Sequence, residues 1–215
     1  MITDSDHLMF ANVYMPELDK AMAVTNILAL PNAVSFWDNY RHTKMIPLMT
    51  KQGQGSMQGA SNYKLGEFTW VDYAPKKIKD WFENHVFPWA GTRARVMALI
   101  TQPGTSNYEH IDCETHELNT RQHKFRIVLQ GRTDTLYFKT AAGDIPAPDV
   151  EGAFVMDGGW PHGMTNVGTE VKVTLAMGAP WTGNNQYRNI DILMDRRQYS
   201  MPTDLTKFWK TSIIV

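Results

Sequence analysis

From Ala94 onward, the sequence is dominated by short runs of apolar and β-branched residues separated by Gly, Asp, Asn and Pro. The runs recur about every ten residues, a spacing typical of strands joined by turns. It predicts strands over 94–101, 106–112, 123–130, 134–140, 152–157, 164–167, 170–178 and 187–194. Eight short strands of this kind predict a β-sandwich or barrel built from two sheets.

The first 92 residues have a different pattern, and we expect them to be helical and irregular. A helix is predicted over 18–30, where apolar residues recur at three-to-five-residue spacing up to a proline. A second helix is predicted over 75–87, because this segment begins with a proline and carries its apolar residues on one face. Residues 51–61 are rich in Gly, Gln and Ser, so we interpret them as a surface loop and a candidate lid.

Length and composition fit a single folded domain. The chain has 215 residues, of which 43% are apolar and 20% are charged, close to ordinary globular usage. We expect residues 1–92 to pack, as a helical layer, on a β core over 93–195. Residues 196–215 would then form a C-terminal tail.

Charge and cysteine usage narrow the possible partners. Lys and Arg total 21 and Asp and Glu total 22, so no basic excess exists to neutralise a phosphate backbone, and we expect no nucleic-acid partner. The single cysteine, Cys113, excludes an intramolecular disulfide framework and favours a reducing compartment. The apolar runs near the start are too short to span a bilayer, and no targeting segment is recognisable. We therefore expect an intracellular, cytoplasmic protein without membrane contact.

The residues that most suggest chemistry are His110, Asp112 and His162. Residues two apart on a strand share a face, so His110 and Asp112 can point to one place. If another strand or turn adds His162, two imidazoles and one carboxylate occupy one face of a metal ion. Such a site leaves adjacent positions open, which suits an Fe(II) ion that holds a bidentate co-substrate and dioxygen. The alternative is a surface-loop histidine and an aspartate that caps a turn.

The segment after His162 adds a second feature. In the predicted strand 170–178, Lys172 and Thr174 share one face. An ammonium and a hydroxyl placed there can bind the far end of a dicarboxylate, the first as a point charge and the second as a donor.

The H-x-D pair, followed about fifty residues later by H-G-M-T-N-V-G-T-E-V-K-V-T, resembles the 2-oxoglutarate- and iron(II)-dependent oxygenases. Within them, the stretch GAFVMDGGWPHGMTNVG is similar to the aspartyl/asparaginyl β-hydroxylase and free amino acid hydroxylase branch. The resemblance covers approximately residues 94–181. It implies a cupin-like double-stranded β-helix, or jelly roll, so that the whole fold is mainly β with N-terminal helices.

The resemblance also implies an activity, that of a dioxygenase which hydroxylates an unactivated C–H bond and releases succinate and CO2. The cofactors would be Fe(II) bound by the three residues named above, 2-oxoglutarate, O2, and ascorbate as an accessory reductant. Lys172 and Thr174 would bind the distal carboxylate of 2-oxoglutarate. The expected partner is then a small-molecule or peptidyl substrate: an amino acid, a peptidyl side chain or a small polar metabolite.

Members of that branch commonly have a basic residue on the strand that follows the first histidine, where it binds the carboxylate next to the keto group of the co-substrate. In the predicted strand 123–130, Lys124 and Arg126 share one face. We prefer Arg126 for this role because its planar fork matches a carboxylate bidentately. The alternative is that both side chains point to solvent on an outer strand.

Several other assignments stay open at this point. Asp157 and Asn166 flank His162 and either orient it or cap turns. The sequence does not decide whether Trp70, Arg95 or Trp160 lines a pocket. Two other functional classes also fit: a cupin-like metal enzyme that does not use 2-oxoglutarate, and a non-catalytic jelly-roll binding module.

Overall fold

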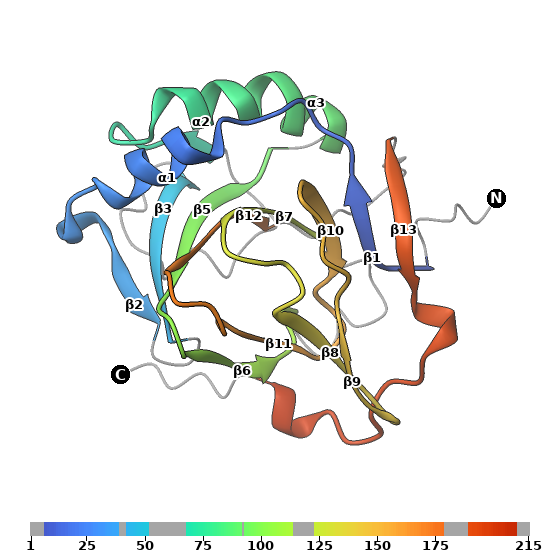
Figure 1. Cartoon of the computed structure of the whole chain (residues 1–215). Coiled ribbons are helices and arrows are strands. Elements are labelled where there is room, and N and C mark those ends of the chain that lie inside the picture. The colour runs from blue at the N-terminus through green and yellow to red at the C-terminus, as the bar shows by residue number, and fades with distance from the viewer. Residues whose placement is uncertain are drawn as a thin grey trace.

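The chain forms two antiparallel sheets that face each other, a large one of nine strands and a small one of four (Figure 1). The structure is a computed structural model, and it describes residues 7–38, 42–51, 68–91, 93–113, 123–178 and 189–209. The predicted loop over 51–61 lies outside these residues, apart from Lys51 at the end of a strand. None of the described helices is long and apolar enough to cross a bilayer.

Eight strands, four in each sheet, form the core. In the large sheet they are ordered β10-β7-β12-β5, and in the small sheet β6-β11-β8-β9. Their bounds are β5 Arg95–Thr101, β6 Ser106–His110, β7 His123–Gln130, β8 Leu136–Thr140, β9 Gly143–Pro146, β10 Ala153–Asp157, β11 His162–Thr165 and β12 Lys172–Gly178. Because consecutive strands pass from one sheet to the other, except for β8 and β9, which pair within the small sheet, the fold is a double-stranded β-helix, and the fold prediction is confirmed.

The large sheet extends beyond this core on both sides. Its full order is β13-β1-β10-β7-β12-β5-β3-β2, and β4 pairs with β3. The added strands are β1 Leu8–Val13, β2 Phe36–Asp38, β3 Thr43–Lys51, β4 Phe68–Trp70 and β13 Ile190–Asp195.

Four of the added strands, β1 to β4, lie within residues 1–92, where helical and irregular structure was expected, so that part of the prediction is wrong. In β1, four consecutive residues from Leu8 are buried, because a strand in the middle of a covered sheet is packed on both faces and loses the two-residue alternation. In β3, the register shifts between Pro47 and Met49, where the proline interrupts the ladder.

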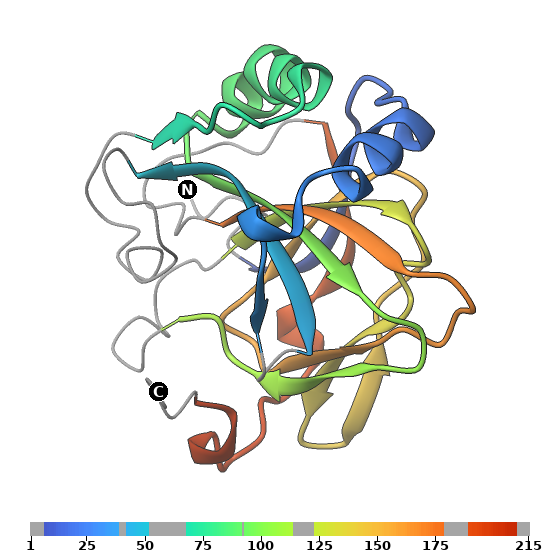
Figure 2. The same cartoon turned by 90° about the vertical axis from the view of Figure 1, so that its left-hand side faces the viewer.

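Helices cover the outer face of the large sheet (Figures 1 and 2). They are α1 Lys20–Leu28, α2 Lys76–Trp81, the π-helix Phe82–Val86 and α3 Phe87–Ala90. Both helix predictions are confirmed, but the second helix continues through Pro88 instead of ending before it. The N–H of Phe87 bonds to the carbonyl of Phe82, five residues earlier, and Pro88 then lies in the first turn of α3, where a proline is tolerated.

Strand alternation divides the large sheet into two chemically different faces. On β12, Val173, Leu175 and Met177 are buried in the main apolar core beneath the helices. The residues between them point inward, between the two sheets. A second apolar cluster that includes Phe10, Phe138 and Trp160 fills part of this space, and a cavity occupies the rest.

The C-terminal segment is partly structured. It contains the 3-10 turns Arg196–Gln198 and Thr206–Phe208, and a further turn, Asn32–Val34, lies near the N-terminal end. Phe208 is buried, and its carbonyl accepts a hydrogen bond from the N–H of Ile111, 3.1 Å away. The described part of the expected tail therefore packs beside the strand end that carries His110.

Candidate metal centre and its cavity

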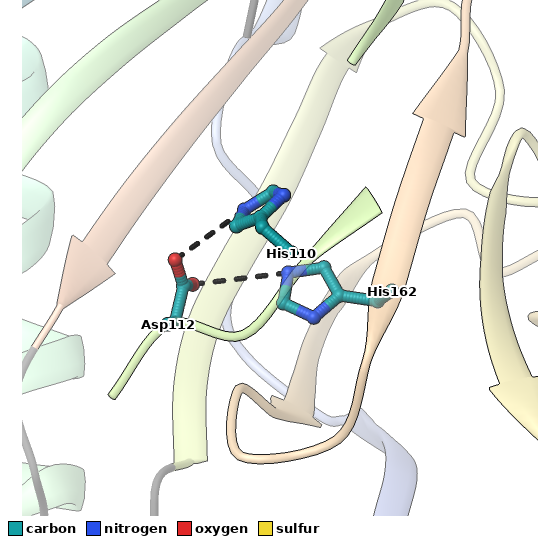
Figure 3. A group of neighbouring side chains, drawn as sticks. All are labelled: His110, Asp112 and His162. Atoms are coloured by element: carbon teal, nitrogen blue, oxygen red, sulfur yellow. Dashed lines mark ion pairs between the residues drawn. The ribbon is translucent and has the colours of Figure 1, made fainter. Parts of the chain in front are cut away.

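His110, Asp112 and His162 meet between the two sheets (Figure 3). Each offers one ligand atom, and these atoms all lie within 4.8 Å of one another. Asp112 Oδ1 is 3.4 Å from His110 Nε2, and Asp112 Oδ2 is 3.8 Å from His162 Nε2. The two imidazole rings are 4.5 Å apart between centroids. The grouping expected from the sequence is therefore present in the tertiary structure.

Strand pairing brings the two histidines together. His110 ends β6 and His162 begins β11, and the two residues are directly paired. The predicted strand over 164–167 thus begins two residues earlier than expected, and His162 lies on the strand. Asp112 follows β6, and its N–H donates a 2.8 Å hydrogen bond to the carbonyl of Gly158, which holds this segment against the turn before β11.

A β-bulge adjusts which side chains of β6 point inward. Met164 pairs with Asn107, whereas His162 pairs with His110, so β6 has one more residue than β11 across this interval. Residues three apart on a regular strand would face opposite sides. Because of the extra residue, both Asn107 and His110 line the cavity.

The histidine rings are oriented by backbone carbonyls. His110 Nδ1 lies 2.8 Å from the carbonyl oxygen of Tyr108, and His162 Nδ1 lies 2.8 Å from that of Trp160. A carbonyl only accepts, so each Nδ1 carries the proton and each Nε2 keeps its lone pair toward Asp112. Burial lowers the pKa of His162 to about 3, with the neighbouring His110 acting in the same direction. A neutral imidazole with a free Nε2, held by a second hydrogen bond, is the form that binds a metal.

The donor set therefore fits a divalent transition metal. Two imidazole nitrogens and one carboxylate oxygen are available, and the remaining space around them opens into a cavity of about 390 Å³. A two-histidine, one-carboxylate set with open positions is typical of non-haem Fe(II) sites.

Lys172 and Thr174 line this cavity from β12, on the shared face that was predicted. Lys172 is buried, and its Nζ donates to the carbonyl of Arg132 and to the hydroxyl of Thr135. Burial lowers the pKa of Lys172 to about 8, against the opposing effect of Asp134 and Asp149. Both Lys172 and Thr174 are thus placed to present polar groups to a ligand in the cavity.

Gly131 allows this placement of Lys172. Its φ of +98° belongs to the region that favours glycine, and a Cβ built there would lie 3.0 Å from Lys172 Cγ.

Arg126 and Lys124 also line the cavity, so the alternative that both face solvent is wrong. Arg126 lies nearer the triad: its Nη2 is 3.7 Å from Asp112 Oδ2, and its Nη1 donates to the carbonyl of Phe125. Lys124 is 2% exposed and lies two residues before Arg126, on the same inward face of β7. Of the two, Arg126 has the contact that places it beside the candidate metal ligands.

Asp157 and Asn166 make turn-capping contacts, the second of the two roles left open. Asp157 Oδ1 accepts from the N–H of Gly159, and Asn166 Oδ1 accepts from the N–H of Gly168. Burial raises the pKa of Asp157, while Arg196, 3.2 Å from its other carboxylate oxygen, lowers it. The histidine rings are held by backbone carbonyls instead. Because every residue has a carbonyl, the sequence does not reveal these groups.

Of the other pocket candidates, Arg95 lines the cavity and the two tryptophans do not. Trp70 donates from Nε1 to Glu83 beneath the helices. Trp160 is buried in the second apolar cluster, and its Nε1 donates to the carbonyl of Lys139.

The fold and the site define a double-stranded β-helix protein with a two-histidine, one-aspartate group able to hold a metal. No protein-family model matches the sequence, and no curated protein matches it either. Among solved structures, the chain is similar to a prolyl hydroxylase from Trichoplax adhaerens in complex with a peptide fragment of the hypoxia inducible factor oxygen degradation domain. The TM-score is 0.51 and the identity 12%, over 81% of this chain and 84% of that one.

Two further similar structures are more distant. A Pseudomonas putida prolyl-4-hydroxylase has a TM-score of 0.47 and 14% identity, over 82% of this chain and 95% of that one. An oxidoreductase of the 2OG-Fe(II) oxygenase family from Burkholderia pseudomallei has a TM-score of 0.40 and 13% identity, over 77% and 82%. At these identities, what the comparison with the Trichoplax protein establishes is the shared fold.

Proposed function

We propose that this protein is an Fe(II)- and 2-oxoglutarate-dependent dioxygenase that hydroxylates an unactivated C–H bond. The observation that carries the proposal is the convergence of His110, Asp112 and His162 in a cavity whose wall also presents Lys172. A metal site without a co-substrate would need only the first three. The buried ammonium is costly to place in a cavity wall, and an incoming carboxylate explains its presence.

Each group in the cavity has a role in this proposal. His110, His162 and Asp112 hold Fe(II), and Lys172 with Thr174 binds the distal carboxylate of 2-oxoglutarate. Arg126, next to Asp112, is our candidate for the carboxylate beside the keto group. When bound, iron, 2-oxoglutarate and O2 supply the oxidation of the C–H bond, with release of succinate and CO2.

The chain's own contribution is binding and orientation. The carbonyls of Tyr108 and Trp160 keep each Nδ1 protonated and each Nε2 available. Burial keeps His162 neutral, so a proton does not compete with the metal there. The apolar residues of the cavity wall restrict water around the reacting groups.

The finer assignment is the aspartyl/asparaginyl β-hydroxylase and free amino acid hydroxylase branch, supported by the stretch GAFVMDGGWPHGMTNVG. The substrate would be an amino acid, a peptidyl side chain or a small polar metabolite. The Trichoplax prolyl hydroxylase was solved in complex with a peptide. We therefore include peptidyl substrates, as well as small molecules, among the candidates for this chain. We also propose that residues 1–215 act as one domain, since β1 pairs with the core strand β10 and β3 with the core strand β5, while β2 and β4 join the same sheet through β3.

The proposal is tested by adding Fe(II) and then 2-oxoglutarate to the purified apo-protein without oxygen. We expect the weak visible charge-transfer band of the iron chelate. His162→Ala should lose the band, and Lys172→Ala should require more 2-oxoglutarate to reach it. His85→Ala, in the π-helix away from the cavity, is the matched control and should behave as the wild type.

The other outcomes identify the alternative classes. If the protein binds the metal but shows no response to 2-oxoglutarate, it is a cupin-like metal enzyme of another kind. If it binds no metal, the three residues are not a metal site, and a non-catalytic binding module becomes the better description.

A further inference from the structure

One turn of the chain supplies backbone groups to two of the three candidate metal ligands. Residues 157–161 run from the end of β10 to the start of β11, and we call them the 157–161 turn. The carbonyl of Gly158 accepts a 2.8 Å hydrogen bond from the N–H of Asp112, and the carbonyl of Trp160 lies 2.8 Å from His162 Nδ1. The position of this turn therefore sets both where the Asp112 backbone lies and how the His162 ring is rotated.

The turn is held from within by Asp157. Its Oδ1 accepts a 2.9 Å hydrogen bond from the N–H of Gly159, and its backbone carbonyl accepts one of 3.2 Å from the N–H of Trp160. Trp160 also donates from Nε1 to the carbonyl of Lys139, 2.7 Å away, which ties the turn to β8. Because Asp157 is buried, its carboxylate needs a compensating charge.

Arg196 contacts both of these side chains from the C-terminal segment. Its Nη1 lies 3.2 Å from Asp157 Oδ2, and its guanidinium carbon lies 5.7 Å from the centre of the Trp160 ring. The first contact is an ion pair, and the second is within the range of cation–π attraction. Lys124 also acts on Asp157 electrostatically, but from the cavity side. Arg196 thus joins Asp157, at the beginning of the turn, to Trp160, near its end.

Arg196 is itself fixed by the surrounding structure. It begins a 3-10 turn directly after β13, the strand that pairs with β1. Asp195 caps this 3-10 turn by accepting a hydrogen bond from the N–H of Arg197. Further on, the carbonyl of Ser200 accepts a 2.8 Å hydrogen bond from the N–H of Ala141. Arg196 therefore reaches the 157–161 turn from a segment that is anchored on both sides.

The same segment makes a second contact next to the triad. The carbonyl of Phe208 accepts a hydrogen bond from the N–H of Ile111, the residue before Asp112. The chain around Asp112 is therefore held by the 157–161 turn at one residue and by the C-terminal segment at the next.

We infer that Arg196 is a positioning residue for the metal site: by holding Asp157 and Trp160 together, it fixes the turn whose carbonyls orient Asp112 and His162. Arg196 does not line the cavity, so it acts through the turn. The inference rests on the metal site of the proposed function and is independent of the co-substrate.

The sign of the effect separates positioning from electrostatics. A nearby cation repels a divalent metal ion, so loss of the Arg196 charge would by itself strengthen metal binding. Loss of positioning weakens it, because a disturbed partner of a ligand typically costs about tenfold to a hundredfold in metal affinity. We therefore expect Arg196→Met to bind the metal about tenfold or more weakly than the wild type.

The test is calorimetric titration with Co(II), which lies next to Fe(II) in the order of affinities for such sites. The wild type should bind the ion, and His162→Ala should lose that binding. Arg196→Met and the double variant Arg196→Met/Asp157→Asn are then titrated, after urea unfolding has shown that each is folded. The double variant leaves no buried carboxylate without its partner, so it should be more stable than Arg196→Met. Its affinity for Co(II) should nevertheless stay about tenfold below that of the wild type, because Arg196 is still missing.

Two controls separate positioning from loss of charge and loss of stability. Arg197→Met removes the same charge from the adjacent residue, whose side chain is 59% exposed and pairs with Asp195. Ile78→Ala destabilises the protein from α2, where Ile78 is fully buried beneath the outer helices. Both controls should bind Co(II) as the wild type does.

The results that would overturn the inference are distinct from those that would overturn the proposed function. If Arg196→Met keeps the wild-type affinity, if affinity returns with stability in the double variant, or if Ile78→Ala weakens binding equally, Arg196 serves stability alone and the metal site stands. Should Arg196→Met not fold, the double variant decides by the same criterion. If the wild type binds no Co(II), or His162→Ala binds it equally well, the proposed metal site fails and this inference with it.

Discussion

Lys172 should make the folded protein less stable at neutral pH than a variant without its charge. Its side chain is 3% exposed, and burial lowers its pKa from the ordinary 10.5 to about 8. At about 1.4 kcal/mol per pH unit, this difference corresponds to about 3 kcal/mol for holding the ammonium in the cavity wall at pH 7. Lys172→Met removes the charge with little change in side-chain volume.

The dependence on pH isolates this contribution. Between pH 8 and pH 10.5 the unfolded chain keeps a proton on Lys172 that the folded chain has released, so the free energy of unfolding of the wild type rises with pH. The variant has no such group. The difference in unfolding free energy, variant minus wild type, should therefore fall by about 3 kcal/mol from pH 7 to pH 10.5. The lost hydrogen bonds to Arg132 and Thr135 shift this difference equally at every pH.

The assay is urea unfolding of both proteins, without metal or 2-oxoglutarate, at several pH values from 7 to 10.5. Lys76→Met is the matched control, because the Lys76 side chain is 84% exposed and the substitution removes a charge from the surface. If the unfolding free energy of Lys172→Met minus that of the wild type stays constant or grows with pH, the reasoning is refuted. In that case Lys172 would not be a buried, charged group in the unliganded protein.

Three further predictions concern the same region. Gly131→Ala should destabilise the protein by about 1–3 kcal/mol in urea unfolding and weaken 2-oxoglutarate binding, because its φ is positive and its Cβ would crowd Lys172. Gly104→Ala, with a φ of +70° and nothing within 4 Å, should destabilise less and leave binding unchanged. The dissociation constant of 2-oxoglutarate should rise as the pH passes above about 8, where Lys172 loses its charge, and calorimetry at pH 7 and 9.5 checks this. Arg196→Met should lower the free energy of unfolding by about 3 kcal/mol at pH 7, because it leaves the Asp157 carboxylate buried without its partner. The double variant Arg196→Met/Asp157→Asn should recover part of this stability. Equal losses in the single and double variants would contradict the prediction.

The local chemistry of the site was largely predictable from strand alternation. Lys172 and Thr174 share the inward face of β12, and Lys124 and Arg126 share that of β7, as a period of two residues requires. His110 and Asp112 were grouped by the same rule on a predicted strand over 106–112, but β6 ends at His110, and Asp112 reaches the site from the segment after the strand. Their meeting with His162 was suggested by a family resemblance, since no local rule joins residues about fifty positions apart.

Other features of the site had no local signal. The bulge in β6 depends on how β6 pairs with β11, a long-range property. The groups that orient the histidines are the carbonyls of Tyr108 and Trp160, which every residue type possesses. Arg95 was an undecided candidate until pairing with Gly178 placed it in the cavity.

By itself, the sequence determined the β core, the outer helices and the residue types that make a metal site chemically possible, because periodicity and side-chain chemistry are local. Only the tertiary structure decided that the first 92 residues add four strands to the large sheet, and that Arg95 and Lys124 pair with Gly178 at the opposite end of β12 from Lys172. Both depend on strand register, which is set by packing between segments far apart in the chain.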